Sequence, residues 1–257
     1  MTAPDILSDH NHGNTLQAIE RTDQQYRDEA ASGPCGFTWC EVETLQDAVC
    51  GNGLSLMESR DDSRYEQFMS SVDSASKAYG AQSIHVADLY VSMGIECAQN
   101  ETDARSKELA LLLLEEAFGI YQAKAGDSHE RTVDCRIHLG KAHHSLGRYD
   151  EALDCFCMAV YMREALLGEP HPSVSEIWVL ISSVHRAKSK LELSLKASAK
   201  ALTGYRNAYG DKHPIVIEVL ETIAGIHIEM GNREKAVDIQ KYVRLHSPKI
   251  DDTKAEF

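Results

Sequence analysis

The sequence predicts an all-α fold, a right-handed superhelical solenoid of antiparallel helix pairs. The main observation is a 42-residue repeat, in which His129, His171 and His213 each follow a glycine by three positions. Small residues recur at three further positions of the same period, fourteen, twenty-six and thirty-three residues past each glycine, with one valine among them. A shared period of this length is typical of stacked supersecondary units that contact only their neighbours.

The reference unit, residues 126–167, predicts one helix hairpin. A first helix is expected over residues 130–145, and in the next two units a proline, favoured in a first helical turn, follows the histidine directly. Gly147 ends this helix, because glycine readily takes the left-handed conformation common at helix C-termini. A second helix is expected over about residues 148–167, and the short loop makes the two helices antiparallel.

Further units flank the reference unit. Residues 168–209 and 210–246 repeat it, although the former has no glycine between its helices. An earlier unit begins at Gly80, and the next unit glycine follows 46 residues later. The four additional residues predict a lengthened turn at 99–103, and residues 61–79 are expected to form a lone second helix.

Three segments follow from this pattern: a leader at 1–60, the solenoid at 61–246 and a C-terminal tail at 247–257. The leader holds ten acidic and three basic residues. Because it offers little apolar surface to bury, we expect it to be partly disordered or loosely helical. The alternative is an acidic interaction tail.

These residues resemble the tetratricopeptide repeat, in the long 42-residue form found in kinesin light chains. The resemblance covers about residues 62–246 and implies a groove lined by the first helices, in which partner peptides bind. Arg136 departs from the neighbouring units, which have Trp178 and Leu220 at the same position. The motifs that carry the resemblance are Gly-x-x-His-Pro-x-Val at 168–174 and 210–216, Leu139-Gly140, Gly147-Arg-Tyr-Asp-Glu-Ala-Leu153, Tyr161-x-Arg163-Glu164 and Gly231-Asn-Arg-Glu-Lys-Ala236.

Composition narrows the class of protein. A net charge of −14 argues against a general nucleic-acid surface or an anionic-membrane surface. No apolar run is long enough to span a membrane, and the N-terminus lacks the pattern of a secretory signal. Seven irregularly spaced cysteines do not resemble a disulfide framework. We therefore expect a cytoplasmic protein.

No motif predicts catalysis, a cofactor or a metal site. The histidines at 129, 171 and 213 are expected to cap helix ends, and those at 143, 185 and 227 to be structural and hydrogen-bonded. Equivalent positions of stacked helices lie roughly 8–10 Å apart, too far to share a metal ion. No phosphate loop or nucleophile motif is present. The sequence therefore predicts no enzyme activity.

The candidate binding residues form an acidic row with basic groups deeper along the first helices. A carboxylate stands eight residues past each unit glycine, and neighbours three or four residues apart share its side of the helix. The preferred ligand would carry Lys or Arg flanking an apolar anchor. The alternative is that each acid merely stabilises its helix through the macrodipole. The candidates are Asp88, Asp134, Glu176, Glu218, Glu221, His138, Lys141, His144 and Arg186.

Three functions remain open at this point. The first is an adaptor that holds an extended peptide segment of a partner in the groove. The second is a structural or assembly subunit that associates with itself through the convex face or the last helix. The third is a regulatory module for an enzyme on another chain. The sequence names neither the partner nor the oligomeric state.

Overall fold

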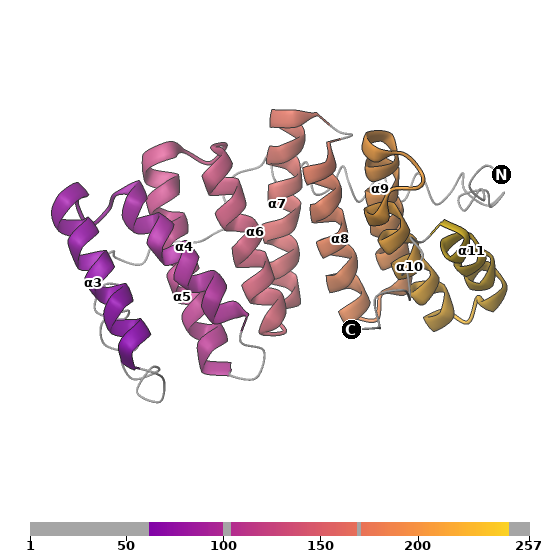
Figure 1. The fold of residues 1–257 in the computed structure, drawn as a ribbon, viewed down its shortest axis with the longest axis horizontal. Coiled ribbons are helices and arrows are strands. Elements are labelled where there is room, and N and C mark those ends of the chain that lie inside the picture. Colours follow the sequence, from indigo (N-terminus) through magenta and orange to yellow (C-terminus); the bar gives the residue numbers. More distant parts are fainter. Residues whose placement is uncertain (1–61, 100–103, 169–170, 247–257) are drawn as a thin grey trace, which may run out of the picture. The chain divides into compact units, whose positions relative to one another are not determined.

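The computed structural model describes residues 62–99, 104–168 and 171–246, and within these ranges every regular element is an α-helix (Figure 1). The predicted all-α helical repeat fold is confirmed. The expectations for the leader, the tail and most of the lengthened turn fall outside the described residues. The chain divides into an N-terminal unit that ends at Met162 and a C-terminal unit that begins at Arg163.

The N-terminal unit contains α3 (Asp62–Tyr79), α4 (Ile84–Ala98), α5 (Ala104–Ala125), α6 (Glu130–Ser145) and most of α7 (Tyr149–Leu167). Helix α3 packs on α4, α4 on α5 and α5 on α6. Helix α3 is the lone second helix that the sequence predicts. The larger of two hydrophobic clusters in this unit has Val86, Leu114, Ala117 and Leu139 among its buried residues, and the smaller one includes Leu109 and Leu113.

The C-terminal unit contains α8 (Pro172–Ala187), α9 (Leu191–Tyr209), α10 (Pro214–Glu229) and α11 (Arg233–His246). Consecutive helices pack together, α8 with α9, α9 with α10 and α10 with α11. Their core includes Leu202, Leu220, Ile223 and Tyr242. Both units therefore repeat the predicted hairpin of a first helix and a second helix.

The repeat histidines begin the first helices, as predicted. The Nδ1 atom of each accepts a hydrogen bond from the backbone N–H two residues later, at 3.2 Å for His129 and His171 and 3.3 Å for His213. In the unit that lacks this histidine, the Ser83 hydroxyl accepts from the N–H of Val86 at 3.4 Å. These bonds satisfy donors that a helix N-terminus otherwise leaves unpaired.

Small residues let the two helices of a hairpin approach closely. A Cβ placed on Gly140 would lie 2.5 Å from the ring of Phe156, so only glycine fits there. The equivalent Ser182 is buried, and its hydroxyl lies 2.9 Å from that of Ser194 and 2.6 Å from that of Ser198. The close contact between paired helices is thus apolar in the α6–α7 pair and hydrogen-bonded in the α8–α9 pair.

Three turns between paired helices that the structure describes contain a left-handed residue. Gly147 has φ 74° and Gly231 has φ 80° in two of these turns. Ser189 occupies the third with φ 57°, the one positive φ among the described residues that are not glycine. A side chain makes this conformation costly, so Ser189 keeps the shape of the hairpin at some expense in stability.

Candidate partner-binding face

The acidic row lies on the first helices and is not equivalent in the two units. Asp88 and Asp134 are half-buried in the N-terminal unit, whereas Glu176 and Glu218 are exposed in the C-terminal unit. Each is the fifth residue of its helix, and α4, α8 and α10 have no acid in the first turn. Because the macrodipole acts mainly within that turn, its stabilisation of acids at the fifth position should be small, and the explanation of the row as helix stabilisation stays a prediction.

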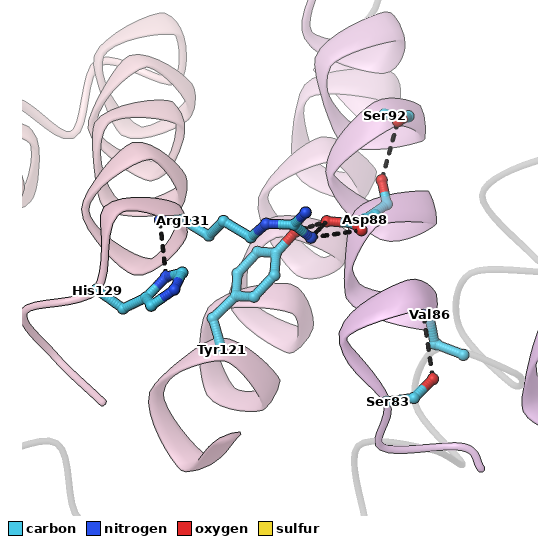
Figure 2. A network of polar contacts seen from close by, with 7 residues as sticks. All are labelled: Ser83, Val86, Asp88, Ser92, Tyr121, His129 and Arg131. Carbon is cyan, nitrogen blue, oxygen red and sulfur yellow. Dashed lines mark hydrogen bonds and ion pairs between the residues drawn. The ribbon is translucent and has the colours of Figure 1, made fainter. Parts of the chain in front are cut away.

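Asp88 is engaged within the protein (Figure 2). The Arg131 guanidinium donates from Nη1 to both carboxylate oxygens, at 2.7 and 2.6 Å, and the Tyr121 hydroxyl donates to Oδ1 at 2.5 Å. Burial is the main reason why the pKa of Tyr121 is raised above its ordinary value, and the hydrogen bond to Asp88 is the second. A ligand would have to displace these groups to reach Asp88.

Arg186 is likewise paired, across the face of the C-terminal unit. Its Nε donates to Oε1 of Glu229 at 2.9 Å, and its Nη2 contacts the same oxygen. The hydrogen bond lowers the pKa of Glu229 and raises that of Arg186. The guanidinium lies beside Gly225, where an added Cβ would be 3.6 Å from Nη2. Both side chains remain partly exposed, so this pair is reachable from solvent.

The basic candidates of the N-terminal unit lie along α6. His138, Lys141 and His144 are half-buried. His138, Lys141 and the row residue Asp134 each interact with other groups of the protein. The His144 ring lies 5.7 Å from the ring of Tyr149, and burial lowers the pKa of His144. At neutral pH the ring of this histidine is therefore mostly uncharged.

The C-terminal unit presents the more accessible surface, which we call the first-helix face. The acids Glu176, Glu218 and Glu221 are exposed on it, and Glu176 also interacts within the protein. Between and beyond them lie apolar and small side chains with partial or full exposure, and Ile228 is 50% exposed. These residues are Val179, Leu180, Ser183, Thr222, Gly225 and Ile228. The arrangement suits attraction of a positively charged ligand around an apolar contact.

The histidines inside the first helices are buried or half-buried, but one expectation about them is wrong. His143 and His227 are buried and His185 is half-buried. The Nδ1 atoms of His143 and His185 lack a hydrogen-bond partner, although the sequence analysis expects hydrogen-bonded rings. Burial lowers the pKa of both, because the charged ring loses its hydration. They therefore serve packing in the neutral form.

No group of three metal-ligating side chains occurs in the part of the chain that the structure describes. Over those same residues, no helix has the length and apolar character needed to cross a membrane.

Sequence reasoning missed the partners Arg131, Tyr121 and Glu229. Repeat spacing gave no common signal: both ion pairs join oppositely charged residues 43 positions apart, but the unit glycines are 46 residues apart around Asp88 and Arg131 and 42 residues apart around Arg186 and Glu229. Tyr121 belongs to a second helix and follows no such spacing.

Comparisons with known proteins agree with this architecture. The family model described as tetratricopeptide repeat matches residues 108–165 and 173–241. None of the curated proteins matches the sequence.

The solved structures give the same fold. The TPR-like repeats described as a kinesin light chain from Podosopora anserina match with a TM-score of 0.61 and 15% identity, covering 94% of this chain and 98% of that chain. BtubC (BKLC) from P. vanneervenii matches with a TM-score of 0.61 and 12% identity, over 92% and 91%. Aspartyl phosphate phosphatase F from Bacillus subtilis matches with a TM-score of 0.54 and 17% identity, over 98% and 67%. This chain belongs to the tetratricopeptide-repeat proteins, and its helix pairs follow the kinesin light chain-like form of the repeat.

Proposed function

We propose that this protein is an adaptor that holds an extended segment of a protein partner against the first-helix face. Tetratricopeptide repeats commonly mediate protein–protein interaction, and scaffolds of this family are generally non-enzymatic. The observation that carries the proposal is the exposure of Glu218 and Glu221 beside partly exposed apolar residues of α8 and α10. We place the protein in the cytoplasm, because its cysteines do not follow a disulfide pattern.

Charge selects the ligand. Glu218 and Glu221 lie one turn apart on α10, so both carboxylates face the same part of the surface. A segment with Lys or Arg on either side of an apolar anchor complements them. Such charges mainly raise the association rate and set the register of the bound segment.

The apolar contact supplies the anchor. Val179 and Leu180 are half-buried on α8, and Ile228 is half-exposed near the end of α10. Burying a leucine-sized side chain against such residues contributes roughly 1.5–3 kcal/mol. The Arg186–Glu229 pair, whose Glu229 follows Ile228 in the chain, would meet the far end of the ligand, where Arg186 could donate hydrogen bonds to a carboxylate if it leaves Glu229.

Binding of a labelled peptide tests this proposal. The probe has a leucine anchor flanked by lysines, and its fluorescence anisotropy is followed with the full-length chain. We expect Glu218→Lys/Glu221→Lys to weaken binding by about tenfold or more, equivalent to about 1.4 kcal/mol. The melting temperature should stay nearly unchanged, since both side chains are exposed.

A matched control is available in the same unit. Glu234→Lys/Asp238→Lys makes the same change of charge on α11, a second helix, and should leave the affinity within about threefold. Equal losses in both double variants would mean that only overall charge matters, and the first-helix face would then not be the binding site.

Two alternative functions remain, self-association as an assembly subunit and regulation of an enzyme on another chain. Light scattering on the purified chain tests the first of these, because a monomer at working concentration would count against an assembly subunit and a concentration-dependent mass would favour it.

A further inference from the structure

The α8–α9 hairpin is the basic part of an acidic protein. Residues 172–209 contain six Lys and Arg and two Glu, a net charge of +4 in a chain of net −14. The α4–α5, α6–α7 and α10–α11 helices are each net negative over the described residues. This local reversal of charge is not explained by the first-helix face, which is acidic.

Two of the six basic side chains form ion pairs within the C-terminal unit, and Lys188 and Lys200 also interact with other groups of the protein. Arg186 pairs with Glu229, and the Nε of Arg206 lies 3.0 Å from a carboxylate oxygen of Asp211. The other four, which we call the hairpin lysines, are Lys188, Lys190, Lys196 and Lys200. One acid of the hairpin, Glu192, stands a turn before Lys196 on α9.

The hairpin lysines extend from the turn along the second helix. Lys190 is exposed at the N-cap of α9, and the half-buried Lys196 and Lys200 lie one turn apart on a side of the helix that is rotated by roughly 80–120° from Lys190. The Nζ of Lys200 lies 4.0 Å from the ring centroid of Trp178, which holds this ammonium at the surface between α8 and α9. From Lys190 to Lys200 the helix rises about 15 Å.

Two further features add to the positive field at the turn. The N-cap Lys190 makes no side-chain capping bond, so the first N–H groups and the positive end of the α9 dipole face the same region. The pKa of His185 reflects this field. Burial is the main cause that lowers it, and the charges of Lys190 and Lys188 lower it further.

We propose that the hairpin lysines bind a short acidic segment of a partner protein in extended conformation. About five residues span the 15 Å between Lys190 and Lys200, at roughly 3.3 Å per residue. Two or three carboxylates would therefore meet the lysines, and an apolar residue could contact Trp178. A nucleic acid fits less well, because its long phosphate backbone would meet the repulsion of the net charge of −14.

This surface is separate from the first-helix face and opposite to it in charge. The C-terminal unit would then bind a basic segment on one surface and an acidic segment on another, as a scaffold that links two partners requires. The inference stands even if the first-helix face binds nothing, since no residue is shared.

Binding of a labelled acidic peptide to the full-length chain tests the proposal. The probe alternates glutamate with alanine, and the same peptide with glutamine in place of glutamate is the neutral control. We expect measurable affinity for the glutamate peptide at low salt, falling steeply as salt is added, and no affinity for the glutamine peptide.

The variants locate the site. Lys190→Glu/Lys196→Glu should weaken binding by about tenfold or more, whereas Lys212→Glu/Lys235→Glu, the same charge change elsewhere in the unit, should change it by less than about threefold. Lys190→Gln/Lys196→Gln should lie between the two. Equal losses in both charge-reversed pairs, or no preference for glutamate over glutamine, would overturn the proposal. So would equally tight binding of a thymidine oligonucleotide that depends on the same two lysines.

Discussion

The guanidinium of Arg131 donates hydrogen bonds to both carboxylate oxygens of Asp88 (Figure 2). Asp88 precedes Arg131 by 43 residues, so this contact links α4 to the start of α6. Arg186 and Glu229 tie α8 to α10 in the same way at the opposite end of those helices. In both units, therefore, a polar link joins two successive first helices. These links compete with any ligand for the same side chains.

Tyr121→Phe should destabilise the N-terminal unit. Tyr121 is 3% exposed, and its hydroxyl donates to Asp88. Removing this donor leaves the packing intact, so we expect a loss of about 0.5–1.5 kcal/mol in the free energy of unfolding, measured by urea denaturation. Tyr79→Phe is the control, because Tyr79 is 63% exposed, and it should have little effect. Equal effects would show that the Asp88 hydrogen bond adds nothing.

Gly140→Ala should be destabilising, whereas Gly225→Ala should not. The new methyl group at 140 would lie 2.5 Å from the Phe156 ring, and overpacking of this kind costs about 1–3 kcal/mol. At 225 the nearest atom is 3.6 Å away, and alanine favours a helix interior by about 0.5–1 kcal/mol. Thermal unfolding of the two variants should therefore shift in opposite directions. A shift in the same direction would contradict the described helix packing.

Ser189→Gly should raise stability. The left-handed conformation costs a non-glycine residue roughly 1–2 kcal/mol, part of which is returned by the greater freedom of glycine in the unfolded chain. We expect a net gain of up to about 1 kcal/mol by chemical denaturation. The converse change, Gly147→Ser at the equivalent turn, should cost a similar amount. A loss of stability in Ser189→Gly would mean that the serine side chain makes a stabilising contact.

Stability should fall as the pH falls through the ordinary histidine range. Burial lowers the pKa of His143 and His185 from the value of 6.5, with Glu151 and Arg148 near the first and Lys190 and Lys188 near the second. Above 6.5 both rings are neutral in either state, and stability is intact. Below pH 6.5 the histidines of the unfolded chain bind protons more readily than the buried rings do, so the free energy of unfolding falls.

The histidine contribution is separable by substitution. Denaturant titrations at pH about 7.5 and about 5.5 should show a smaller difference in His143→Gln/His185→Gln than in the parent chain. An unchanged difference would assign the acid sensitivity to other groups.

The helices were predictable because their determinants are local. The histidine before each first helix, the glycine after it and the small residues at close contacts all act within one hairpin, and their positions recur with the period. The lone second helix α3 and the glycine-free turn at Ser189 followed from the same alignment. Helix boundaries differ from the predicted ones by about one residue.

The site was less predictable because it depends on contacts between different helices of one unit. Asp88 and Glu218 occupy the same repeat position, yet one is bound by Arg131 and Tyr121 and the other is exposed. The repeat period predicts the backbone position of a residue. It does not predict which long side chain from another helix contacts that residue. The unpaired Nδ1 atoms of His143 and His185 were missed for the same reason.

Photo-crosslinking maps the proposed partner site most directly. The probe is the lysine-flanked leucine peptide with a photoreactive group in place of the anchor, irradiated with the full-length chain and analysed by mass spectrometry. The proposal predicts adducts on α8 and α10 at residues of the first-helix face, such as Val179, Leu180 and Thr222, and their loss in Glu218→Lys/Glu221→Lys. Adducts confined to α9, α11 or the N-terminal unit would contradict it.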